Sequence, residues 1–176
     1  MATATERINA PPDTGGDSRM TRALIVVLRV GVALLWIENA GWKTPPDFTS
    51  LQKFTMYAVE YPVLAPFTWV IEALVLPNFI FFGWMTLLLE ASLGAFLLIG
   101  LATRFWAVVG LVQTLAITMS VLNAPNEWEW SFYLMILAHV ALFATAAGRV
   151  FGLDGVLRPI WRTSSSRVAG LLMRLS

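Results

Sequence analysis

The sequence contains no cysteine and a single histidine, His139. Without cysteine the chain forms no disulfide, no thiolate metal site, no iron–sulfur ligation, no CxxC redox pair and no covalent attachment of a c-type haem. One histidine is also too few for bis-histidine ligation of a haem within one chain. The sequence therefore carries no metal, haem or flavin signature, and we expect any redox chemistry to depend on a partner or on a mobile cofactor.

Charged residues are scarce as well. Only 13% of the 176 residues are charged and 57% are hydrophobic, whereas soluble domains average about 25% charged and 45–50% apolar. The mean hydropathy is +0.69. The few basic residues gather at the ends of apolar segments and form no continuous basic surface. The composition predicts one compact integral membrane domain, and it argues against nucleic acid as a partner.

Four apolar segments have the length that a membrane-spanning helix requires, which is about 20 residues. They cover about residues 21–42, 79–101, 105–122 and 129–147. Residues 61–77 are also apolar but contain three prolines and are too short to cross, so they predict an interfacial or re-entrant segment. The expected fold is all-α: an integral membrane four-helix bundle with this segment between its first two helices.

The two chain ends differ from the apolar core. Residues 1–20 are rich in proline, glycine and charge, and predict a disordered cytoplasmic tail. Residues 21–160 form the expected membrane domain. Residues 161–176 repeat leucine and valine at helical spacing with Arg167 and Arg174 on the polar side, which favours an interfacial amphipathic helix. A frayed tail is the alternative.

The basic residues lie asymmetrically along the chain. Arginines precede the first expected span, occupy the turn between the second and third, and follow the fourth, whereas the opposite side holds only Lys43 and Lys53. Because positively charged loops stay in the cytoplasm, this distribution predicts cytoplasmic N- and C-termini. The expected location is a bacterial-type inner (plasma) membrane that the chain crosses several times.

Each expected span carries one polar residue at a similar depth. Arg29, Glu90, Gln113 and His139 all lie roughly 12–16 Å from the same membrane boundary, at a rise of about 1.5 Å per residue. Because charged groups in the bilayer are costly and usually functional, we expect one interior layer in which Arg29 neutralises Glu90. Glu90 and His139 are the candidate catalytic residues, with Arg29, Gln113 and Trp36 as ligand-binding candidates. The alternative is a structural network that fixes the register of the helices.

A second polar group is expected near the outer face, where Glu38, Lys43 and Glu72 lie close to the ends of apolar segments. One interpretation is an access or docking site for a polar substrate. The other is a set of interfacial charges whose side chains extend to water.

Several short motifs, taken in order, resemble those of the DoxX family of four-helix membrane proteins. They are LRVG at residues 28–31, the exit ENAGWK at residues 38–43 and GRVFGLD at residues 148–154, which contains Arg149 and Asp154. Glu90 matches the family's intramembrane acid in the second span, and Arg104 matches the basic turn that follows it. The resemblance covers about residues 22–160.

The DoxX family includes DoxD-type subunits of thiosulfate:quinone oxidoreductases, so the resemblance implies a membrane subunit of a respiratory or redox assembly. We expect the chain to bind a quinone or similar lipid at the intramembrane charged layer and to exchange electrons with a partner protein. A noncatalytic anchor or accessory subunit of a larger membrane complex is the alternative, and a small transporter is a third class. Membrane lipid is an expected partner in every case.

Overall fold

The computed structural model describes residues 19–176. The expected disordered tail, residues 1–20, lies outside these residues except for Arg19 and Met20, which begin the first helix. Within the described part the chain is helical and contains no strand. This confirms the all-α fold that the composition and the apolar segments predict.

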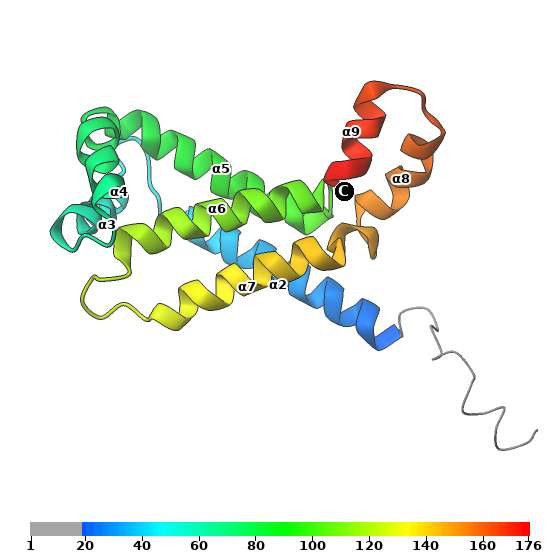
Figure 1. Ribbon diagram of the computed structural model, residues 1–176, viewed down its shortest axis with the longest axis horizontal. Coiled ribbons are helices and arrows are strands. Elements are labelled where there is room, and N and C mark those ends of the chain that lie inside the picture. Colours follow the sequence, from blue (N-terminus) through cyan, green and yellow to red (C-terminus); the bar gives the residue numbers. More distant parts are fainter. Residues whose placement is uncertain (1–18) are drawn as a thin grey trace, which may run out of the picture.

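Four long helices form an up-and-down bundle, in which successive members run in opposite directions (Figure 1). They are α2 (Arg19–Gly41), α5 (Phe79–Ile99), α6 (Thr103–Val121) and α7 (Glu129–Thr145). By length and composition, three helical stretches of the described chain are able to cross a membrane: Arg19–Gly41, Thr103–Val121 and the 35-residue stretch Ala65–Ile99. With 17 residues, α7 is near the lower limit for crossing. The chain is a multi-pass membrane protein.

Short helices cover one end of the bundle, which we call the cavity end (left in Figure 1). Here α3 (Thr49–Glu60) is followed by α4 (Ala65–Val70), the π-helical turn η1 (Ile71–Val75) and the 3₁₀ turn η2 (Leu76–Asn78). The segment for which the sequence suggested an interfacial or re-entrant position is thus helical and leads directly into α5. Pro77 lies at the junction, where its missing N–H prevents a continuous α-helical ladder.

The opposite end, which we call the terminal end, contains the start of α2 and the last helices of the chain (Figure 1). A 3₁₀ turn η3 (Ala147–Arg149) leads into α8 (Leu153–Thr163), and α9 (Arg167–Leu175) folds back on α8. The sequence predicted one amphipathic helix in residues 161–176, and α8 runs across the start of that range.

The bundle is held together by close contacts between α2 and α5 and between α6 and α7. Gly94 shows how closely the first pair approaches, because a Cβ there would overlap the side chain of Ile37. Small residues at such contacts allow membrane helices to pack backbone against backbone. The buried core lies between all four helices and consists of Val32, Ala33, Trp36, Leu93, Leu97, Ala107, Leu142 and Ala147.

Candidate ligand-binding site

An ion pair is buried between the first two long helices. The Nζ of Lys43, in the loop after α2, lies 2.5 Å from Oε2 of Glu90 in the middle of α5. The Lys43 side chain is 2% exposed and that of Glu90 is fully buried. Since a buried charge is tolerated only when it is paired and hydrogen-bonded, each of these two residues makes the other possible.

Two further groups complete the coordination of this pair. Nζ of Lys43 also donates a hydrogen bond of 2.6 Å to the backbone oxygen of Asn39, in the last turn of α2. Nε2 of Gln113, on α6, donates a hydrogen bond of 3.0 Å to Oε1 of Glu90. Three helices therefore converge on one carboxylate, and its two oxygens have different partners.

A cavity of about 490 Å³ opens on this group from the cavity end, and we call it the α3 cavity. Its floor includes Lys43, Glu90 and Gln113, and its walls come from α2, α3, α4, η1, α5, α6 and α7. The lining is mostly apolar and aromatic, with Trp42, Phe54, Phe67, Ile71, Phe82, Ile117 and Phe132 among its members. Size, apolar walls and a few convergent polar groups are the usual properties of a small-molecule site.

The floor of the cavity retains hydrogen-bonding capacity for a ligand. An ammonium has three donors, and Lys43 uses two of them, for Asn39 and Glu90. A primary amide has two donors, and Gln113 uses one of them, for Glu90. The site can therefore donate to an oxygen acceptor next to a carboxylate that is able to hold or release a proton.

The expected pairing of Arg29 with Glu90 is wrong. Nη2 of Arg29 donates to the backbone oxygen of Phe151 at the terminal end, at 3.1 Å, and Glu90 pairs with Lys43 instead. Equal sequence distances from the helix ends give equal depths only if all the helices begin and end in two common planes. The structure shows α2 displaced along the bundle toward the terminal end (Figure 1). Because of this displacement, Arg29 lies beside the end of α5. Lys43 lies beside Glu90, which is eleven residues and about 16 Å from the start of α5.

Arg29 belongs to a separate buried network at the terminal end. Its guanidinium is 2% exposed and lies against Gly100 and Gly152, where a Cβ would overlap Nη1. The carboxylate of Asp154 accepts hydrogen bonds from the backbone N–H groups of Ala102, at 2.7 Å, and Thr103, at 2.9 Å. These contacts tie the start of α8 to the turn between α5 and α6, so the GRVFGLD motif contributes to the architecture of this end.

His139 and Trp36 form a third buried group, away from the α3 cavity. Nε1 of Trp36 donates to Nε2 of His139 at 2.9 Å, and Nδ1 of His139 lies 2.8 Å from the backbone oxygen of Met135. Both ring nitrogens are engaged, which fits a neutral ring protonated at Nδ1. Neither residue lines the cavity. The geometry supports a structural role for the pair and brings neither residue to Glu90.

Gly110 on α6 provides a test of this packing. A Cβ at Gly110 would overlap the ring of His139, whereas nothing lies within 4 Å of a Cβ at Gly31 on α2. We expect Gly110→Ala to lower the melting temperature in detergent by about 5 °C, corresponding to the 1–3 kcal/mol typical of overpacking. Gly31→Ala, the matched control, is expected to leave it unchanged or raise it. Equal melting temperatures for the two variants would contradict the observed contact.

The remaining candidates occupy both ends. Glu38 and Glu72 are exposed, and in the described chain neither has an ion pair or hydrogen bond to Lys43, so the three do not form one cluster.

At the terminal end, Nε of Arg104 donates to the backbone oxygen of Phe143, and Nη2 of Arg149 donates to that of Ser176. Burial lowers the pKa of Arg149, and the positive charges of Arg158 and Arg104 lower it further, against the opposing effect of Asp154.

Residues 19–176 contain no group of three or more histidine, aspartate or glutamate side chains arranged to hold a metal ion.

Glu90 and Gln113 were predicted from the sequence as site residues, but Lys43 was not recognised as the partner of Glu90. The signal was present, because Lys43 and Lys53 are the only lysines in the chain and Lys43 directly follows the first span.

Comparison with known proteins gives one result that covers most of the chain. A family model described as "TQO small subunit DoxD" matches residues 24–174. No curated protein and no solved structure matches the chain. The matched region includes α5, α6, α7, α2 from residue 24 onward, the α3 cavity and the network around Arg29 and Asp154.

Proposed function

The chain belongs to the DoxD family, and from this membership and the α3 cavity we propose that it is an integral membrane subunit that binds a quinone or quinol for a redox assembly. The cavity is the observation that carries the proposal. The family is described as a small subunit, which supports a partner protein that exchanges electrons with the bound quinone.

The shape and lining of the α3 cavity suit a quinone headgroup. Its volume of about 490 Å³ lies within the 300–1,000 Å³ range typical of small-molecule sites. The aromatic residues Trp42, Phe54 and Phe67 line its walls and offer faces against which a flat ring packs. An apolar cavity within a membrane protein also favours a lipid-soluble ligand over a water-soluble one.

The polar floor supplies the chemistry that a quinone needs. The unused donors of Lys43 and Gln113 are placed to hold a carbonyl oxygen, and Glu90 is placed to accept or release a proton beside it. Reduction of a quinone to its quinol consumes two electrons and two protons. In the proposed assembly the partner handles the electrons, while this chain binds the headgroup and exchanges its protons.

The proposed location is a bacterial-type plasma membrane with the terminal end on the cytoplasmic side. Support comes from the arginines of that end, which include Arg104, Arg149 and Arg158, because positive charge marks the cytoplasmic side. In this orientation the α3 cavity lies toward the outer side of the membrane.

A pair of variants on α6 tests the binding proposal. Ala116 lines the cavity, whereas the adjacent Leu115 is 41% exposed on the outside of the bundle. Ala116→Phe introduces a ring at a cavity-lining position and leaves both residues of the ion pair unchanged. We expect it to weaken equilibrium binding of short-tailed benzoquinone and naphthoquinone analogues to the protein in lipid nanodiscs by about tenfold or more, equivalent to at least 1.4 kcal/mol.

Leu115→Phe is the matched control and is expected to bind the analogues as the unsubstituted protein does. Saturable binding that Ala116→Phe does not weaken would place the quinone elsewhere. A complete lack of quinone binding, together with stoichiometric copurification with a larger complex, would instead support a noncatalytic anchor subunit.

A further inference from the structure

We propose that the α3 cavity is also a proton route between Glu90 and the aqueous face of the cavity end, and that Glu127 is the residue that exchanges protons with water. The inference deepens the proposed function, on which it rests, by assigning a path to the protons of the bound quinone. It concerns Glu127, in the loop between α6 and α7, which lines the α3 cavity but supplies none of the proposed contacts to the quinone headgroup.

Glu90 needs such a route. Its side chain is fully buried, and its oxygens contact Lys43 and Gln113. The helices around it span the membrane, so the surrounding lipid offers no path for a proton. The α3 cavity connects this carboxylate with the cavity end of the bundle, and a second cavity of about 490 Å³, next to Pro45 and Leu87, reaches Lys43 but not Glu90.

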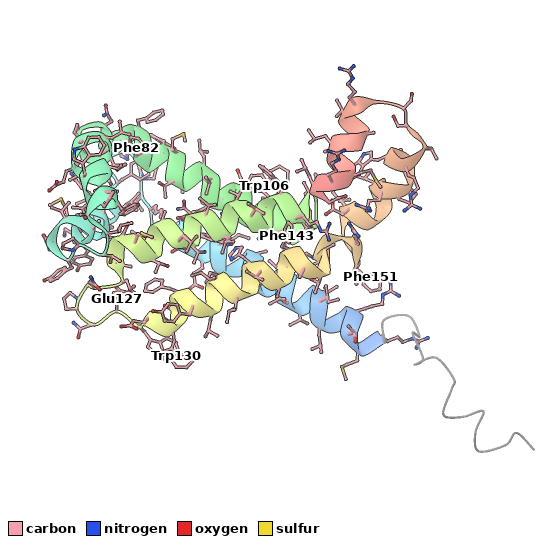
Figure 2. All side chains as sticks on the ribbon, viewed as in Figure 1. Phe82, Trp106, Glu127, Trp130, Phe143 and Phe151 are labelled. Atoms are coloured by element: carbon pink, nitrogen blue, oxygen red, sulfur yellow. The ribbon has the colours of Figure 1, made fainter. Side chains whose placement is uncertain are left out.

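Three titratable residues line the cavity: Lys43, Glu90 and Glu127. The first two form the buried ion pair. Glu127 is half-buried, in the loop after α6 at the cavity end, and Figure 2 shows it at the same end as Phe82, another residue of the lining. Within the described chain its carboxylate makes no ion pair and no hydrogen bond.

Polar groups lie along the wall between the two carboxylates. Gln113 and Ser120 both line the cavity and are seven residues apart on α6, which places them on one face about 10 Å apart. Oγ of Ser120 donates to the backbone oxygen of Ala116, which leaves its lone pairs able to accept. Thr55 on α3 and Thr86 on α5 add hydroxyls to the same lining. These groups offer hydrogen-bond partners to water in the cavity.

The proposed step transfers one proton at a time. A proton released at Glu90 passes through cavity water to the carboxylate of Glu127. Glu127 then gives this proton to bulk water and is restored to the carboxylate, so that the net result is the transfer of one proton from Glu90 to water. Uptake runs in the opposite direction. Glu127 acts here as a general acid–base relay, a role that carboxylates commonly fill.

The two lysines of the chain allow the route to be tested without a quinone. With [¹⁵N]lysine labelling, the full chain in nanodiscs gives two ammonium signals, one from buried Lys43 and one from exposed Lys53. Exchange of the Lys43 protons with water, measured by NMR, reports proton access to the ion pair, and Lys53 is an internal reference. Glu127→Gln is expected to slow the Lys43 exchange about tenfold or more, since general acid–base groups contribute 10²–10⁴-fold.

Glu129→Gln is the matched control, because Glu129 lies two residues away, is exposed and does not line the cavity. We expect it to leave the Lys43 exchange unchanged, and both variants to keep the melting temperature of the unsubstituted protein. Equal exchange in the two variants would overturn the route. So would Lys43 exchange as fast as that of Lys53 before any substitution, because the ion pair would then be open to water without a relay.

Quinone binding is measured separately, on the unsubstituted protein, so that the two proposals are tested independently. Slowed exchange without any quinone binding would overturn the proposed function and leave the proton route in place. Normal quinone binding with unchanged Lys43 exchange would overturn the proton route and leave the proposed function in place.

Discussion

Replacing Glu90 by glutamine is expected to lower the melting temperature in detergent by about 10 °C or more and to abolish quinone binding. The substitution leaves the Lys43 ammonium buried without its counter-charge, although Gln113 can still bond to the new amide. Breaking a buried ion pair by removing one partner costs about 3–5 kcal/mol. For a domain of this size each kcal/mol shifts the melting temperature by roughly 2–4 °C.

A double variant separates the two effects. Replacing a buried pair by uncharged groups of similar volume is often neutral or stabilising. We therefore expect Lys43→Met combined with Glu90→Gln to recover most of the lost thermal stability. Quinone binding should not return, because the ammonium donor and the carboxylate are both missing.

The matched control is Glu38→Gln, which makes the same chemical change at an exposed position on α2. It should alter neither melting temperature nor binding. Quinone binding by the stable double variant would show that the ion pair serves the fold alone and that the ligand contacts other residues. An unchanged melting temperature in Glu90→Gln would mean that Lys43 reaches water despite its burial.

The positions of the helices were largely predictable because the membrane constrains them strongly. A membrane-spanning helix needs about 20 apolar residues, and prolines and turn residues mark the ends of each apolar segment. Phe79–Ile99 and Thr103–Val121, for example, lie close to the expected ranges of 79–101 and 105–122. Helix α8 was not expected, because its apolar residues alternate along the sequence with Asp154, Arg158 and Arg162.

The pairing of the polar residues was not predictable from depth alone. Sequence distance measures position along one helix, but the displacement of one helix against another depends on loop conformation and on packing. Residues 42–48 and the short helices that follow allow α2 to end well inside the bundle (Figure 1). As a result Lys43 reaches Glu90, while Arg29 reaches the terminal end. Gln113 was placed correctly beside Glu90 because α5 and α6 are joined by a tight turn that fixes their relative displacement.

At the terminal end, Asp154→Asn is expected to lower the melting temperature by about 8 °C. The side chain is fully buried, and its two oxygens accept the N–H groups of Ala102 and Thr103. Hydrogen bonds to a charged group contribute about 1.5–3 kcal/mol, and asparagine turns one acceptor into a donor that faces an N–H. The negative charge near Arg29 is lost as well. We expect a net cost of about 3 kcal/mol, which corresponds to this shift at 2–4 °C per kcal/mol.

The turn that Asp154 holds makes this position unusually sensitive. Gly100 has φ +68° and Ala102 has φ +50°, so a non-glycine residue is kept in the left-handed region, where such conformations cost about 1–3 kcal/mol. Without the carboxylate the turn is free to relax, and the amides of Ala102 and Thr103 should exchange with deuterium much faster than before. Asp47→Asn is the matched control, because Asp47 also accepts a hydrogen bond, from the Thr49 hydroxyl, but is exposed and lies at the opposite end. If both variants keep the original melting temperature and amide protection, Asp154 does not fix the turn and the Arg29 network must be held by packing alone.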